Sequence, residues 1–137
     1  MNEELFVSRV EQLGGFEGKA EAMRAIRATL VSLGERLQDD ERSALSRALS
    51  PAFRALLERA AYAGDFDRDG LFARVARHGG LDRGRAVESA QMVCRALAAS
   101  LAMEPLTRLT KELGPSIASL FAEPEPVSTL PRVSETK

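Results

Sequence analysis

The sequence predicts an all-α protein: one bundle-like domain over residues 1–122, made of two tandem, pseudo-symmetric copies of a unit of about four helices. Apolar residues recur at spacings of three and four, the period of an amphipathic helix. Strand signals are weak, because aromatic residues are 5% of the chain and no run alternates β-branched with polar residues. Similar segments also return about 65 positions apart, which places the copies at about 5–60 and 70–122.

Two pairs of segments define the repeat. RVEQLGGF (9–16) returns as RVARHGGL (74–81) at an offset of 65, and LSPAFRALL (49–57) returns as LGPSIASLF (113–121) at an offset of 64. The glycine pairs and the matched prolines carry most weight, because both residue types constrain the backbone. Each copy alone, at about 55 residues, would bury a small fraction of its apolar surface, so we expect the copies to share one core.

The first helix of each copy is expected to begin at a capping residue and to end at glycine. Under the offset of 65, Asn2 corresponds to Asp67, and each side chain can accept a hydrogen bond from a free amide of the first turn. The glycine pairs at 14–15 and 79–80 follow, and glycine closes a helix in the left-handed conformation without steric cost.

The second helix of each copy is the longest, and it carries one apolar stripe. The stripe comprises Ala22, Ile26, Leu30, Leu33 and Leu37 in the first copy and Ala86, Ala90, Cys94, Leu97 and Leu101 in the second. These spacings of four and three place all members of a stripe on one helix face. We expect both faces to be buried in the common core.

The third and fourth helices of each copy are expected to start behind a cap. Four pairs place a flanking residue before the expected first helical residue: Asp40 before Glu41, Ser50 before Pro51, Glu104 before Pro105 and Gly114 before Pro115. Proline is favoured at the first helical position, since the amide it lacks has no intrahelical acceptor there. Residues 123–137, EPEPVSTLPRVSETK, have three prolines and no apolar periodicity, which predicts a disordered C-terminal tail.

The overall composition and charge of the chain argue against several classes of protein. The net charge is −1, so no global field attracts the chain to nucleic acid or to an anionic membrane. The single cysteine, Cys94, excludes an intramolecular disulfide and a multi-cysteine zinc site, and it suits a reducing compartment. No apolar run approaches the roughly 20 residues of a membrane helix, and acidic residues stand where a signal peptide would be basic. We expect a cytoplasmic protein.

The segment GDFDRDGLF (64–72) begins like a calcium-binding loop, with Asp65, Asp67 and Asp69 alternating before a glycine. A calcium loop starting at Asp65 needs a bidentate carboxylate at its twelfth position, and that residue is Ala76. Asp67 is instead the expected cap, and Asp69 places negative charge near the positive end of the helix dipole. We therefore expect a helix start here, with no metal and no cofactor.

The sequence contains no recognisable catalytic set. His78 is the only histidine, and no motif places a nucleophile or carboxylate beside it. Cys94 stands where the first copy has Leu30 on the apolar stripe, which predicts a buried core thiol rather than a nucleophile. No G-x-x-x-x-G-K-[S/T] string is present to cradle phosphates. We expect the protein not to be an enzyme.

A cluster of basic residues surrounds the turn between the first and second helices of the second copy. The basic patch consists of Arg74, Arg77, His78, Arg83 and Arg85. Such a patch can contact phosphates or an acidic partner. Asp82 and Glu88 lie close to it in sequence, and no aromatic residue is interleaved for base stacking, so a solvated helix face is the favoured interpretation and a binding role is the alternative.

Taken together, these positions resemble those of the uncharacterised bacterial family called domain of unknown function 2267. The first copy carries the resemblance with Phe6, Arg9, Val10, Ala22, Ile26, Leu30, Leu33, Arg36, Leu37, Leu49, Pro51, Leu56 and Leu57. The second copy carries it with Phe72, Arg74, Val75, Ala86, Leu97, Leu101, Leu113 and Pro115. The resemblance covers roughly residues 4–122 and implies tandem helical copies, but it implies no activity.

Three functions follow as hypotheses. The first is a cytosolic interaction or regulatory module that binds another protein or a second copy of itself, since an aliphatic helical scaffold suits helix-in-groove contact. The second is weak nucleic-acid binding through the basic patch, from Arg74 to Arg85. The third is a small-ligand binder or enzyme with a pocket between the copies.

Overall fold

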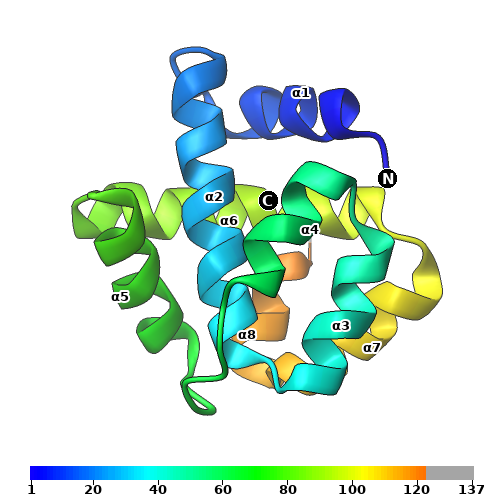
Figure 1. The fold of residues 1–137 in the computed structure, drawn as a ribbon. Coiled ribbons are helices and arrows are strands. Elements are labelled where there is room, and N and C mark those ends of the chain that lie inside the picture. The colour runs from blue at the N-terminus through cyan, green and yellow to red at the C-terminus, as the bar shows by residue number, and fades with distance from the viewer. Residues whose placement is uncertain (123–137) are drawn as a thin grey trace, which may run out of the picture.

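The computed structural model describes residues 1–122, and the predicted disordered tail at 123–137 lies outside the described residues (Figure 1). Within the described range the chain forms eight α-helices and a short 3-10 helix, without strands. The first four helices are α1 (Glu3–Gly14), α2 (Lys19–Arg36), α3 (Asp39–Ala48) and α4 (Pro51–Glu58). The rest are α5 (Arg68–Gly79), α6 (Arg83–Ser100), α7 (Met103–Leu113), α8 (Pro115–Ala118) and η1 (Ser119–Phe121). The all-α prediction is confirmed.

The two halves of the chain present their helices in the same order. Helices α1 and α5 have 12 residues each, and the long helices α2 and α6 have 18 each. Helices α3 and α7 follow with 10 and 11 residues, and then a helix headed by proline, of 8 residues in α4 and of 4 in α8, which η1 extends. The number and order of helices therefore agree with the predicted copies, while the duplication itself stays a prediction.

The predicted boundaries of the first helices are confirmed at both ends. The Asn2 carboxamide accepts a hydrogen bond from the Leu5 amide at 2.9 Å, and the Asp67 carboxylate accepts one from the Gly70 amide at 3.1 Å. Gly15 and Gly80 then close α1 and α5 with φ values of 61° and 62°. A side chain would be strained in this left-handed conformation, which explains glycine at both positions.

Two of the predicted starts are wrong by a few residues. Helix α3 begins at Asp39 behind Gln38, so Asp40 is inside the first turn and is not the cap. Helix α7 begins at Met103, which makes Pro105 its third residue. Pro105 is tolerated inside the first turn because amides there have no intrahelical acceptor, so proline loses no hydrogen bond. Asp40 is tolerated there because the helix dipole favours an acidic residue near the start of a helix.

The core forms where the two long helices meet. Figure 1 shows α2 running across α6, and the two helices pack against each other. All five residues of the first predicted stripe have no exposed surface, and four of their counterparts in the second are equally buried, with Leu101 at 8%. The last member of each stripe, Leu37 and Leu101, is the C-terminal cap of α2 and of α6. Helices α1 and α5 each pack against both long helices. Each half therefore depends on the other for its burial, as the shared core requires.

Arg36, at the end of α2, fixes the segment that leads into α5. Its guanidinium donates to the backbone carbonyl of Phe66 at 2.8 Å and to that of Leu113 at 3.0 Å. It also pairs with the Asp65 carboxylate at 3.2 Å. One side chain thus joins α2, the start of α5 and the end of α7, since a guanidinium offers five donors in a fixed plane.

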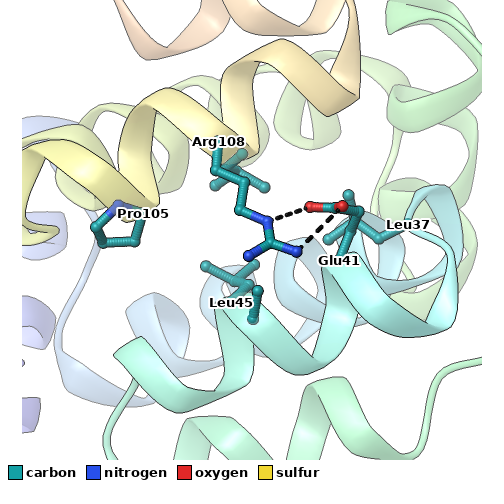
Figure 2. Close-up of a pocket in the computed structure, with 7 residues that line it drawn as sticks. Leu37, Glu41, Leu45, Pro105 and Arg108 are labelled. Carbon is teal, nitrogen blue, oxygen red and sulfur yellow. Dashed lines mark hydrogen bonds and ion pairs between the residues drawn. The ribbon is translucent and has the colours of Figure 1, made fainter.

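Helices α3 and α7 also pack against each other and so join the two halves (Figure 2). The Arg108 guanidinium of α7 donates to both carboxylate oxygens of Glu41, at 2.7 and 3.3 Å. This hydrogen bond and the positive charge hold the pKa of Glu41 below its usual value. The cavity beside the pair is about 20 Å³. That volume suits a single water and is far too small for a metabolite.

Among residues 1–122, no helix combines the length and the apolar character that crossing a bilayer demands.

Candidate functional site

The structure divides the predicted basic patch among several acidic partners. Arg74 and His78 both face α2, where the Glu35 carboxylate accepts from Arg74 at 3.1 Å and lies 3.0 Å from His78 Nε2. The Arg74 guanidinium also stacks on the Phe66 ring, 4.5 Å from its centroid. These contacts hold α5 against α2 and use part of the charge that the patch would offer to a ligand.

The remaining members of the patch lie in different surroundings. Arg83 pairs with Asp69 at 3.1 Å, and Arg85 pairs with Glu21 at 2.8 Å. A backbone hydrogen bond from Glu17, with the hydrogen bond from Arg85, keeps the pKa of Glu21 below its usual value. Within residues 1–122, Arg77 alone among the five has no carboxylate within 4.0 Å. The patch is therefore not one continuous cationic surface.

A different cationic surface appears where α4 and α5 flank α2. Figure 1 shows α2 between these two helices. We call this surface the arginine groove; it is open and has a volume of about 700 Å³. Helix α2 contributes Arg24, Arg27, Ala28 and Val31, and α4 contributes Leu56 together with its C-terminal cap, Arg59. Helix α5 contributes Arg77, His78 and Gly79 together with its C-terminal cap, Gly80. The volume of the groove falls in the range of ligand-binding clefts.

The arginine groove carries an excess of positive charge, which Glu21, three residues before Arg24 on α2 and outside the lining, offsets only in part. No acidic residue of the described chain lines it. Its four arginines, Arg24, Arg27, Arg59 and Arg77, are all exposed. None has a carboxylate oxygen of residues 1–122 within 4.0 Å of its guanidinium nitrogens. Four unpaired guanidinium groups around one depression repel each other, and an anionic ligand would relieve that repulsion.

Corresponding positions in the other half indicate that the fold does not require these arginines. Under the predicted offsets of 64 and 65, Arg24 and Arg27 correspond to Glu88 and Gln91, and Arg77 corresponds to Gln12. Helices α6 and α1 have the same lengths as α2 and α5 and pack in the same kind of pair. Since glutamine and glutamate occupy the corresponding positions, helix packing alone does not explain the arginines at positions 24, 27 and 77.

The equivalent surface of the other half is a smaller groove of about 460 Å³. It is lined by Arg9, Gln12 and Leu13 of α1, Arg95, Ala98 and Ala99 of α6, and Phe121. Arg9 donates to the Ser100 hydroxyl at 3.3 Å, and Leu13 is 42% exposed. This groove has two arginines instead of four and a more apolar lining, so the two sides of the molecule offer different chemistry.

The other candidates for chemistry have structural roles. The three aspartates of the calcium-like segment have separate partners: Asp65 binds Arg36 and Tyr62, Asp67 caps α5, and Asp69 pairs with Arg83. No cluster of three His, Cys, Asp or Glu side chains within residues 1–122 could hold a metal ion. Cys94 is fully buried, and burial raises the pKa of its thiol far above the usual value. Such a thiol is protonated and inert near neutral pH.

Sequence reasoning found Arg77 and missed Arg24, Arg27 and Arg59. These three lie on α2 and at the end of α4, so only the packing of α4 and α5 on α2 brings them beside Arg77. One feature of the sequence does distinguish two of the groove arginines. Neither Arg27 nor Arg77 has an acidic residue three or four positions away, where a helical salt-bridge partner would stand. That pattern marks arginines whose charge is not neutralised within their own helix.

The fold and this groove define an all-α domain with a cationic surface depression. The chain belongs to the family described as uncharacterized conserved protein (DUF2267), whose model matches residues 3–120. The resemblance drawn from the repeated helical positions is thus confirmed. No curated protein matches the chain with significance.

Proposed function

We propose that this protein is a non-catalytic, cytoplasmic interaction module that binds an acidic segment of another protein through the arginine groove. The observation that carries the proposal is the group of four exposed arginines without a carboxylate partner in residues 1–122. Guanidinium groups bind carboxylates in bidentate geometry and are less strongly hydrated than ammonium groups, which suits them to interfaces. The cationic groove would also steer an acidic partner toward the surface.

The chemistry of the two most reactive side-chain types supports a non-catalytic role. His78, the only histidine, contacts the Glu35 carboxylate through Nε2 at 3.0 and 3.1 Å. Cys94, the only cysteine, is inside the core, where it has no access to a substrate. A general base needs a reacting group within hydrogen-bond reach, and a nucleophile needs exposure.

Nucleic acid is the second candidate partner, because unpaired arginines also bind phosphates. The lining of the arginine groove disfavours it. Within the described chain its apolar residues are Ala28, Val31 and Leu56, and no aromatic ring is available for bases to stack on. The net charge of −1 also gives the whole chain no attraction to a polyanion.

Affinity capture with matched variants tests the proposal. The wild-type chain and the variants R27Q/R77Q and R47Q are used as baits in native lysate, with and without nuclease. Arg47 is exposed on α3 and does not line the groove, so R47Q controls for an exposed arginine elsewhere. We expect a protein retained by wild type and R47Q, lost with R27Q/R77Q, and unaffected by nuclease. Equal retention by all three baits contradicts the proposal. Loss after nuclease treatment favours nucleic acid instead.

A further inference from the structure

We infer that the segment bound by the arginine groove is an amphipathic helix with acidic side chains beside an apolar stripe. This inference rests on the proposed function and adds the conformation and pattern of the partner. It follows from the arrangement of two kinds of surface in the groove: four arginines, and an apolar area formed by the half-buried Val31 and Leu56.

The α2 side of the groove presents one stripe along a helix. Arg24, Arg27 and Val31 follow each other at spacings of three and four, which puts them on the same face of α2. From Arg24 to Val31 this face extends for about 10 Å, nearly two helical turns. The flanking helices α4 and α5 both pack on α2 and provide the sides of the groove. A surface with this repeat matches a ligand whose own contacts recur every three to four residues.

The apolar residues indicate what the ligand must offer besides charge. Val31 and Leu56 are half-buried, so their remaining exposed surface lies within reach of a ligand in the groove. An acidic segment held only by its carboxylates would leave this apolar area in water. An amphipathic helix covers it with an aliphatic side chain while neighbouring carboxylates reach the arginines.

The two surfaces are expected to affect different steps of binding. Exposed charges act at long range, accelerate encounter and are screened by salt. Apolar contacts act only after docking and therefore control dissociation. The arginines thus set the association rate and its salt dependence, and Val31 with Leu56 set the lifetime of the complex.

Labelled synthetic peptides test this inference in the full chain. The probe is a peptide of about 15 residues, near the length at which isolated helices become marginally stable, with glutamate and leucine at helical spacing. A scrambled peptide of the same composition is the control. Fluorescence anisotropy should show roughly tenfold weaker binding of the scrambled peptide, the loss expected when the apolar side chains no longer share one face.

Kinetics of the variants then separate the two surfaces. R27Q/R77Q should lower the association rate about tenfold at low salt and flatten its salt dependence, whereas V31Q should mainly raise the dissociation rate. R47Q should match wild type. Thermal unfolding of each variant confirms that it is folded. Arg27 and Arg77 have no ion-pair partner in residues 1–122, so replacing them should not lower the melting temperature.

The outcomes distinguish the inference from the proposed function. Equal binding of the helical and scrambled peptides, or no change with V31Q, overturns the amphipathic helix while leaving an acidic protein partner in place. No binding of either peptide at low salt also overturns it. Tighter binding of a single-stranded RNA than of the helical peptide, lost with R27Q/R77Q, overturns it in favour of nucleic acid. The proposed function itself fails when capture from lysate is independent of the groove arginines or is lost after nuclease treatment.

Discussion

At the scale of single residues, polar side chains in this protein mostly terminate or connect helices. Asp67 accepts from the Gly70 amide and so begins α5, while Arg36 donates to carbonyls of Phe66 and Leu113. Asp65 and Asp69, which flank the cap, pair with separate arginines. The exposed arginines of the groove are exceptions, since none of them forms an ion pair with a carboxylate of residues 1–122. Replacing a side chain with a structural role should change the free energy of unfolding, whereas replacing one with a binding role should change the affinity for the ligand.

Replacing Asp67 with alanine is expected to lower the free energy of unfolding by about 1 kcal/mol, because a first-turn amide of α5 loses its acceptor. Chemical denaturation measures the change. Asp67→Asn should retain most of the stability, since its carboxamide oxygen also accepts. Calcium should leave the melting temperature of the wild type unchanged. A calcium-dependent rise that disappears in Asp67→Ala would identify a metal site and contradict the capping role.

At the scale of elements, each long helix contributes an equivalent apolar face to the interior. Leu33 of α2 and Leu97 of α6 correspond under the predicted offset, and neither has any exposed surface. The spacing of such residues predicted both helices with their buried faces. The sequence predicted the starts of the shorter helices α3 and α7 less accurately. Residues such as Asp40 and Pro105 are compatible with several positions in the first turn of a helix, so they do not fix its first residue.

Leu33→Ala and Leu97→Ala are each expected to lower the free energy of unfolding by roughly 2–5 kcal/mol, since each leaves a cavity in the core. Denaturant titration of both variants measures this. Leu13→Ala is the control, because Leu13 is 42% exposed and its loss should change stability by less than about 0.5 kcal/mol. A large cost at one core site with almost none at the other would contradict equivalent roles for the two stripes.

At the scale of the whole molecule, the halves hold each other because α2 packs against both α5 and α6, α1 packs against α6, and α3 packs against α7 (Figure 2). The contact of α3 with α7 includes the ion pair of Glu41 and Arg108, whose side chains are 23% and 51% exposed. The pair is screened by solvent, so its contribution is modest, yet it depends on pH in a predictable direction.

Glu41→Gln is expected to lower stability near neutral pH and to have little effect in acid. The pKa of Glu41 is lowered in the folded state by its hydrogen bond from Arg108. The ionised form therefore stabilises the fold above the usual carboxyl value near 4.5, and that contribution is lost as the pH falls through the folded-state pKa. Unfolding of both proteins from pH 7 to pH 3 checks this. A stability difference that persists unchanged at the acidic end would contradict it.

The sequence alone determined the helical class, the apolar faces and several helix ends, because these depend on spacing and on caps within a few residues. Asn2, Asp67, Gly15 and Gly80 are such local signals. Only the tertiary structure decided which charges are neutralised. The partner of Arg74 is Glu35, 39 positions away, and Arg24, Arg27 and Arg59 meet Arg77 only after α4 and α5 have packed on α2. Charge–charge contacts depend on distances in space, which a helical repeat in the sequence does not specify.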